Sequence, residues 1–159
     1  MRPRTPKGTR TMGDRERWEE FIRSLDLPHF SPAEVLMMGK AHETPGHPGY
    51  RLNTLPPWDM RFAIAAQARM VSALRSYFAA PLTVLSWYRS PAYNRAIKGS
   101  PNSYHLSGIA TDLTGAELDV LCLVAKKMQK AGLIGGLGIY GNRGFIHIDA
   151  GPSRVWGDS

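Results

Sequence analysis

The chain has 159 residues, of which 43% are hydrophobic and 21% are charged, a composition typical of a globular protein with one domain and its own core. Its single cysteine, Cys122, excludes an intrachain disulfide framework. The net charge of +7 favours an anionic partner, and no stretch approaches the ~20 apolar residues of a membrane-spanning helix.

The first twelve residues contain four basic side chains and no acidic one, so residues 1–12 are predicted to form a flexible basic tail. Such a tail either attracts a polyanion, such as nucleic acid, anionic lipid or a cell-wall polymer, or only adds solubility. No signature of an RNA- or DNA-binding module accompanies it, so no specific nucleic-acid partner is predicted. No apolar run follows the positive charges, which predicts that there is no secretory signal peptide.

Helices dominate the predicted first half of the chain. Residues 13–26 have apolar side chains at helical spacing, and this helix is expected to dock on the following domain or to bind a partner. A short helix begins at Ser31 with a capping box and ends at Gly39. A long helix is predicted over residues 57–79, with a buried ridge of residues four apart: Trp58, Phe62, Ala66, Met70, Leu74 and Phe78.

Residues 42–57 are rich in proline and glycine and are predicted to form a loop that lines a substrate groove. His42 and His47 lie five apart in this loop, with Glu43 beside His42. They are interpreted either as solvated loop side chains or as part of a second metal site.

Strands alternate with helices in the second half. β-branched and aromatic residues predict a strand over 81–88, and alternation predicts another over 109–113. Helices are predicted over residues 91–97 and 115–130, a hairpin of two strands over 135–140 and 144–149, and a closing tail over 152–156.

Two histidines and two carboxylates stand out from this apolar pattern. His105 and Asp112 lie seven apart on either side of Gly108, which permits a turn between them. His147 and Asp149 lie two apart, so they share one face of a predicted strand. Neighbouring strands can bring His105, Asp112 and His147 to one point. We predict that these three residues bind Zn²⁺ and leave a fourth position open, as in catalytic zinc sites.

The spacing Ser-x-His-x6-Asp over Ser103–Asp112, followed by His-x-Asp at His147, resembles the zinc D-Ala-D-Ala carboxypeptidase family. This family includes bacterial and phage peptidoglycan peptidases and is related in fold to hedgehog-type domains. The segments Ser86–Asn94 and Gly136–Tyr140 fit the same pattern, and the resemblance covers roughly residues 28–157. It implies an α+β fold in which a small antiparallel sheet carries the zinc site and packs against helices.

The resemblance also implies a division of the chain and roles for individual residues. A zinc peptidase domain is expected over residues 28–159, after an N-terminal helix over 13–27 and the basic tail. Arg89 is expected to stabilise an oxyanion or to hold a substrate carboxylate, or else to form a structural ion pair. Ser103 either contacts substrate or caps a turn, and Tyr140 is a reserve candidate for substrate contact.

The general base is where the sequence departs from the family pattern. Many family members have Glu or Asp three residues before the last histidine, and this chain has Gly144 there. Asp149 is the available replacement. We predict that it activates water, with the alternative that it fixes the tautomer of a ligand histidine.

The resulting prediction is a zinc metallopeptidase that hydrolyses peptidoglycan stem peptides or cross-links, of D-Ala-D-Ala carboxypeptidase, endopeptidase or endolysin type. A chain without a signal peptide is expected to be made in the cytoplasm and to reach the wall by phage lysis or with phage-like particle proteins. The alternatives are a catalytically silent, zinc-containing wall-binding or particle component, and a protein that binds nucleic acid through its basic tail.

Overall fold

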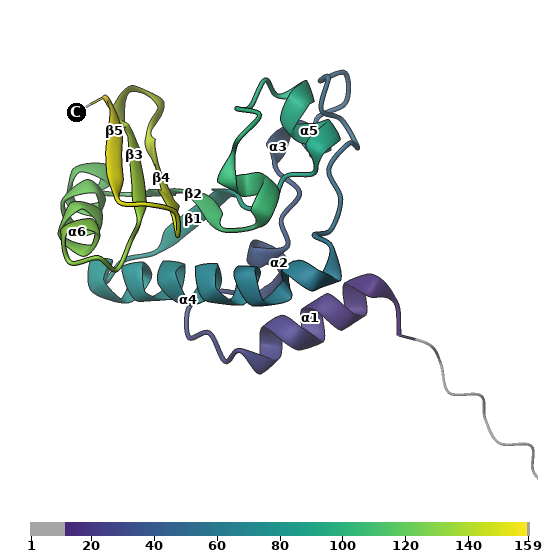
Figure 1. The fold of residues 1–159 in the computed structure, drawn as a ribbon, viewed down its shortest axis with the longest axis horizontal. Helices are drawn as coiled ribbons and strands as arrows, with labels where there is room; N and C mark the ends of the chain where they lie inside the picture. The colour runs from purple at the N-terminus through teal and green to yellow at the C-terminus, as the bar shows by residue number, and fades with distance from the viewer. Residues whose placement is uncertain (1–11, 159) are drawn as a thin grey trace, which may run out of the picture.

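The computed structural model describes residues 12–158, so most of the predicted basic tail over residues 1–12 lies outside the described residues. Five strands form one sheet in the order β1-β2-β4-β3-β5 (Figure 1). Their bounds are β1 Leu82–Ser86, β2 Ala110–Gly115, β3 Gly136–Tyr140, β4 Phe145–Asp149 and β5 Arg154–Asp158.

The sheet is antiparallel except at one edge. β1 pairs with β2, β2 with β4, and β4 with β3, all antiparallel. β5 pairs parallel to β3, because the chain reverses after β4 and then lies along the outer side of β3. The predicted α+β fold with a small, largely antiparallel sheet is therefore confirmed, with a fifth strand where only a closing tail was expected.

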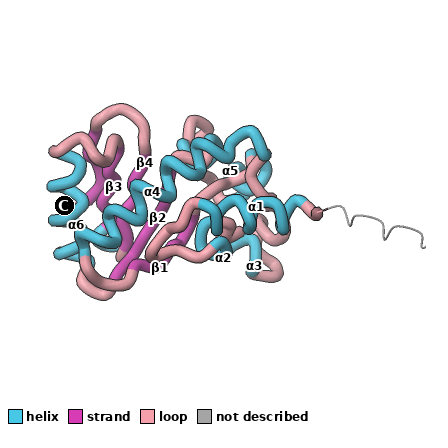
Figure 2. Tube along the Cα trace, turned by 90° about the horizontal axis from the view of Figure 1, so that it is seen from below, coloured by secondary structure: helices cyan, strands magenta, loops and turns pink. Residues whose placement is uncertain are grey.

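Six α-helices and three 3₁₀ turns surround the sheet within residues 12–158. The helices are α1 Asp14–Ser24, α2 Pro32–Val35, α3 Lys40–Glu43, α4 Arg61–Phe78, α5 Pro91–Ala96 and α6 Leu118–Lys130. The 3₁₀ turns are η1 Trp58–Met60, η2 Tyr104–Ser107 and η3 Gly141–Arg143. Figure 2 shows α4 running across the strands, so one face of the sheet is covered by this helix.

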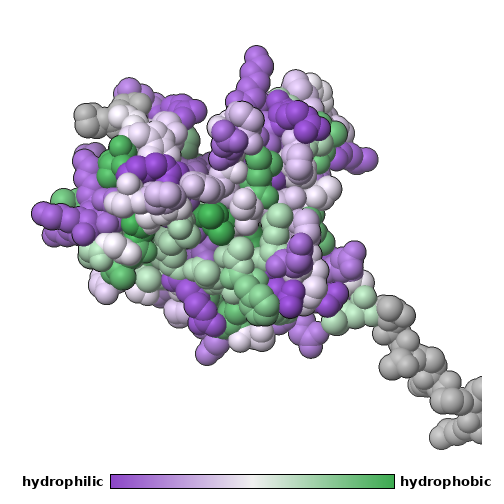
Figure 3. Space-filling view, in the orientation of Figure 1, coloured by the Kyte–Doolittle hydropathy of each residue, from purple (hydrophilic) through white to green (hydrophobic). Residues whose placement is uncertain are grey.

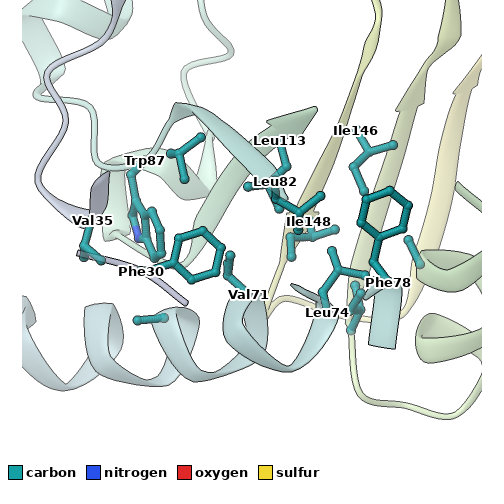
Figure 4. Packing of buried hydrophobic residues seen from close by; sticks show 14 of the residues in the cluster. Phe30, Val35, Val71, Leu74, Phe78, Leu82, Trp87, Leu113, Ile146 and Ile148 are labelled. Carbon is teal, nitrogen blue, oxygen red and sulfur yellow. The ribbon is translucent and has the colours of Figure 1, made fainter. Parts of the chain in front are cut away.

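The hydrophobic core lies between α4, α6 and the covered face of the sheet. Ile146 and Ile148 of β4 and Leu113 of β2 point into it and meet Val71 and Leu74 of α4 (Figure 4). All five side chains are completely buried. Since alternate residues of a strand face opposite sides, this burial turns Asp112, His147 and Asp149 toward the other face of the sheet.

The predicted buried ridge over residues 57–79 is wrong at Phe62 and Ala66. Phe62 is 67% exposed, and Ala66 is exposed as well, whereas Ile64, Ala68 and Val71 are completely buried. The reason is geometric: four residues turn an α-helix about 40° past a full turn, so a ridge at steps of four winds off the buried face. Leu74 and Phe78 are buried in the core, and Trp58 and Met70 pack against it partly buried.

The first helix packs on the rest of the protein as expected. Trp18 of α1 is 2% exposed, and its indole Nε1 donates a hydrogen bond to the carbonyl of Pro56 at 3.0 Å. Its ring meets Trp58 edge to face at 5.1 Å. Among the described residues, no helix combines the length and the apolar character that crossing a membrane requires.

Candidate metal centre

The uncovered face of the sheet carries polar side chains in two adjacent rows. Asp112 of β2 pairs with His147 of β4, and His147 pairs with Gly138 of β3. Two residues further along β4, Asp149 pairs with Gly136 of β3. Because directly paired residues point to the same side of a sheet, the strand register alone brings Asp112, His147 and Asp149 onto one face.

His105 reaches this face from η2 rather than from a strand. The Oγ of Ser103 accepts a hydrogen bond from the His105 amide at 3.4 Å and caps the turn, and Gly108 ends it with φ 72°. That left-handed conformation suits glycine, as predicted. Ser103 also lines the groove described below, so the capping interpretation and the substrate-contact interpretation are both compatible with its position.

The three predicted ligands converge. His105 Nε2 lies 3.2 Å and His147 Nδ1 lies 2.8 Å from Oδ1 of Asp112. Within residues 12–158, these residues form the one group of three or more His, Cys, Asp or Glu whose ligand atoms all lie within 4.8 Å of one another. Two nitrogens and one carboxylate oxygen are a donor set that suits zinc.

The other nitrogen of each imidazole is already engaged. His105 Nδ1 lies 2.5 Å from the carbonyl oxygen of Trp87, which only accepts, so this nitrogen carries the proton. His147 Nε2 lies 3.0 Å from Oδ2 of Asp149, and an ionised carboxylate there likewise fixes the proton on Nε2. In both rings the nitrogen left unprotonated is the one that faces Asp112, which is the arrangement a metal ligand needs.

Charges around Asp112 keep it ionised. Arg89 donates from Nη2 to Oδ2 of Asp112 and from Nε to Ser86 Oγ at 2.8 Å. Burial alone would raise the pKa of Asp112, but His105, His147 and Arg89 together hold it far below its ordinary value. Arg89 therefore pairs with a predicted metal ligand, as in the structural alternative considered for it, while it also lines the groove.

Asp149 lies behind His147 and has no exposed surface. Its Oδ1 accepts from the amides of Gly151 at 2.8 Å and Gly136 at 3.2 Å, and its Oδ2 faces His147. The prediction that Asp149 activates water required a carboxylate open to the groove. The position found favours the alternative, a carboxylate that orients the His147 imidazole.

Arg154 on β5 is a site residue that the sequence reasoning missed. Its Nη2 donates to Oδ2 of Asp149 at 2.6 Å and its Nη1 to Oδ1 at 3.2 Å, so the guanidinium holds the carboxylate with both nitrogens. The sequence feature that could have indicated this contact is Gly136. A Cβ at this position would collide with both Asp149 oxygens and with Arg154. A glycine inside a strand marks such a close approach.

Trp156 is a second site residue that was not predicted from the sequence. The sequence feature that could have indicated it is Gly138. A Cβ at Gly138 would lie 2.8 Å from two carbons of the Trp156 indole. The indole lies across this space with its centroid 5.3 Å from that of His147, and its Nε1 donates to Tyr140 Oη at 2.9 Å. Tyr140, predicted as a substrate contact, is therefore fixed at the groove wall by Trp156.

These residues surround a groove of ≈ 510 Å³ between the α5–η2 segment and the uncovered face of the sheet. The surface is hollowed between these two parts of the molecule, with hydrophilic side chains on both sides (Figure 3). The groove is lined by the three predicted ligands together with Arg89, Lys98, Ser103, Tyr104, Tyr140, Arg143, Arg154 and Trp156, among others. Of the described carboxylates, Asp112 is the one that lines it.

The loop histidines do not join a second cluster among the described residues. His42 Nδ1 accepts from the amide of Asn53 at 3.0 Å, and His47 Nδ1 accepts from the amide of Gly49 at 2.9 Å. Both rings therefore brace the loop. Its first residues form α3, which corrects the prediction that residues 42–57 are loop throughout.

Comparison with known proteins supports the zinc-peptidase resemblance. The profile of the family described as Peptidase M15 matches residues 28–149. The chain is 36% identical over 84 residues to the probable peptidoglycan L,D-endopeptidase MepK of Haemophilus influenzae, and 34% identical over 83 residues to peptidoglycan L,D-endopeptidase MepK of Escherichia coli K12. It is 35% identical over 78 residues to the zinc D-Ala-D-Ala carboxypeptidase of Streptomyces albus G.

These alignments cover only parts of the proteins. Each covers 48% of this chain, and the chain spans 43% of the length of the two MepK proteins and 30% of the carboxypeptidase.

Proposed function

This chain belongs to the peptidase M15 family, and we propose on that premise that it is a zinc-dependent peptidase that hydrolyses peptide bonds in peptidoglycan stem peptides or cross-links. The observation that carries the proposal is the convergence of His105 Nε2, Asp112 and His147 Nδ1 at the floor of an open groove. The names of the similar proteins supply the substrate class.

The residues present fit a zinc ion. His105, Asp112 and His147 would hold it, because their free donor atoms face one another while the remaining ring nitrogens are bonded to Trp87 and Asp149. A zinc ion bound there supplies Lewis acidity, which polarises a peptide carbonyl and makes water more acidic.

Neighbouring side chains orient the predicted metal ligands and are placed to contact a substrate. Asp149 and Arg154 lie behind His147 and fix its orientation, and Arg89 balances the charge of Asp112. The hydroxyl of Tyr140 already accepts a hydrogen bond from Trp156, so its own proton is free to be donated toward a substrate oxygen. Arg89 and Ser103 also line the groove and are proposed as substrate contacts.

The shape of the site favours an endopeptidase over a carboxypeptidase. A second cavity of ≈ 300 Å³ adjoins the first and shares Arg89, Ile97, Asp112 and Phe145 with it. Of the predicted metal ligands Asp112 borders it, and from there it extends toward Lys40, His47 and Tyr93. We propose that a peptide chain extends from the groove into this second cavity, whereas a carboxypeptidase needs room for only one residue beyond the cleaved bond.

Gly144 bears on the alternative of a catalytically silent binding component. This residue ends η3 in a left-handed conformation with φ 75°, and no atom lies within 4 Å of the position its Cβ would take. A glycine here is thus explained by the turn between β3 and β4. The missing acid at this position is not by itself a sign of lost catalysis. Delivery by phage lysis or in a virion-like particle stays a prediction from the sequence.

Mass spectrometry of muropeptides released from purified sacculi tests the proposal and reports the cleaved bond. We expect the zinc-loaded protein to release products, and His105→Ala and Asp112→Ala to abolish release and zinc binding together. His29→Ala is the matched control, because His29 is exposed and bonds Ser76 far from the groove. Wall binding without any product from the wild type, or full activity of His105→Ala without metal, would refute it.

A further inference from the structure

Four cationic side chains line the groove, and two of them are already paired with carboxylates. Arg89 is paired with Asp112, and Arg154 is paired with Asp149. The other two are Lys98 and Arg143. Among the described residues, neither of these has an acidic side chain within ion-pair distance. The groove therefore has two positive charges that no carboxylate of the described chain balances.

Arg143 is held in a pre-organised position. Its guanidinium carbon lies 4.3 Å from the ring centre of Tyr140 and 4.9 Å from that of Phe145, and these two rings stack on each other at 4.8 Å. Contact with aromatic rings leaves the N–H donors at the edge of a guanidinium available for hydrogen bonds. A carboxylate matches that edge with two parallel hydrogen bonds.

Lys98 is the second cation of the groove that no described carboxylate balances. Its φ is 57°, a left-handed conformation that glycine adopts at lower cost than lysine. The side chain is exposed at the rim of the same groove, in the turn that follows α5. The left-handed φ belongs to the turn that ends α5, in which the Gly99 amide donates to the carbonyl of Asn94 at 2.8 Å. What Lys98 adds to the groove is therefore its charge at the rim.

We propose that Arg143 and Lys98 form a carboxylate-binding subsite, so that the enzyme selects peptides with a free carboxylate near the cleaved bond over their amidated counterparts. This inference rests on the proposed function and deepens it. In a stem peptide with lysine at its third position, two groups have the required chemistry: the α-carboxylate of D-Glu and the C-terminal carboxylate.

Two pairs of synthetic stem peptides distinguish these sources. In one pair the α-carboxyl group of D-Glu is free or amidated, and in the other the C-terminus is an acid or an amide. We expect the wild type to prefer the free acid of one pair by about tenfold in kcat/KM, the value of one well-formed charge-assisted contact.

Substitutions of Arg143 and Lys98 test whether these two residues cause the preference for the free acid. Arg143→Gln should lower kcat/KM for the free acid about tenfold more than for the amide, and Lys98→Gln should have a smaller effect in the same direction. Arg143→Lys should be intermediate, since it keeps the charge but loses the planar fork. Arg69→Gln removes one exposed cation from α4, outside the groove, and should keep the preference of the wild type.

Binding of the same peptides, measured by calorimetry, separates this inference from the proposed function. A binding preference that Arg143→Gln abolishes would support the subsite even if no peptide is cleaved. Equal cleavage and equal binding of acid and amide in both pairs would overturn the subsite and leave the peptidase intact. An equal loss for acid and amide in Arg143→Gln would also overturn it.

Discussion

Asp149 supports His147 from behind: the two side chains meet at 3.0 Å between Oδ2 and Nε2, and the carboxylate has no exposed surface. Five hydrogen bonds converge on its two oxygens, from His147, Gly136, Gly151 and twice from Arg154. Such a carboxylate has little capacity left to take a proton from water. Its geometry is that of a group that holds a metal-binding imidazole in one tautomer.

We therefore predict that Asp149→Asn weakens zinc binding by about 10–100-fold, because the asparagine no longer fixes the proton on His147 Nε2. Competition with a chelating dye measures the effect. Asp119→Asn, at an exposed position of α6, is the control and should bind zinc like the wild type. If Asp149→Asn keeps full zinc affinity while kcat collapses, Asp149 is the general base after all.

Zinc affinity should also depend on pH through His147. Burial lowers its pKa, but hydrogen bonds to Asp112 and Asp149 outweigh this and raise the pKa above the ordinary value. A raised pKa means that the metal-free protein keeps the proton to higher pH, and zinc must displace it. The affinity should therefore fall as the pH drops, starting above the ordinary histidine value of about 6.5.

A pH series of zinc-binding isotherms checks this expectation. In Asp149→Asn the raising interaction with Asp149 is lost, so the pH-dependent fall should move to lower pH. An affinity that stays constant until well below the ordinary histidine value would contradict the role assigned to His147.

The predicted metal ligands could be found from the sequence because each lies in a recognisable local pattern, although Asp112 and His147 are 35 residues apart and meet only through strand pairing. Alternation in the two strands puts Asp112 and His147 on the face opposite the apolar residues, and Gly108 allows the turn that returns His105 to them. Alternation within each strand therefore identifies the polar face without knowledge of the tertiary structure.

Arg154 and Trp156 could not be found in this way. β5 is only five residues long, contains a glycine and pairs with β3 at the sheet edge, so its own sequence carries a weak strand pattern. The two side chains face the site only because Gly136 and Gly138 leave room for them. That relation joins residues on different strands, and periodicity within one strand does not report it.

Gly138→Ala should destabilise the protein by about 1–3 kcal/mol, because the added methyl group collides with the indole of Trp156, which itself packs beside His147. Denaturant unfolding measures the change. Gly141→Ala is the matched control, since nothing lies within 4 Å of its Cβ position. If the two variants are equally stable, the close approach of Trp156 to β3 is not needed for the fold.

The last prediction concerns α1 and uses two aromatic residues with opposite surroundings. Trp18 is 2% exposed, bonds the carbonyl of Pro56 and packs edge to face against Trp58, so Trp18→Ala should cost about 3–5 kcal/mol. Phe62 is 67% exposed and lies over the Arg61 guanidinium at 4.3 Å, so Phe62→Ala should cost less than about 1 kcal/mol.

Unfolding of both variants in denaturant makes the comparison. A small loss in Trp18→Ala would mean that α1 is a separate appendage, available to bind a partner, and a large loss in Phe62→Ala would restore the ridge predicted from the sequence.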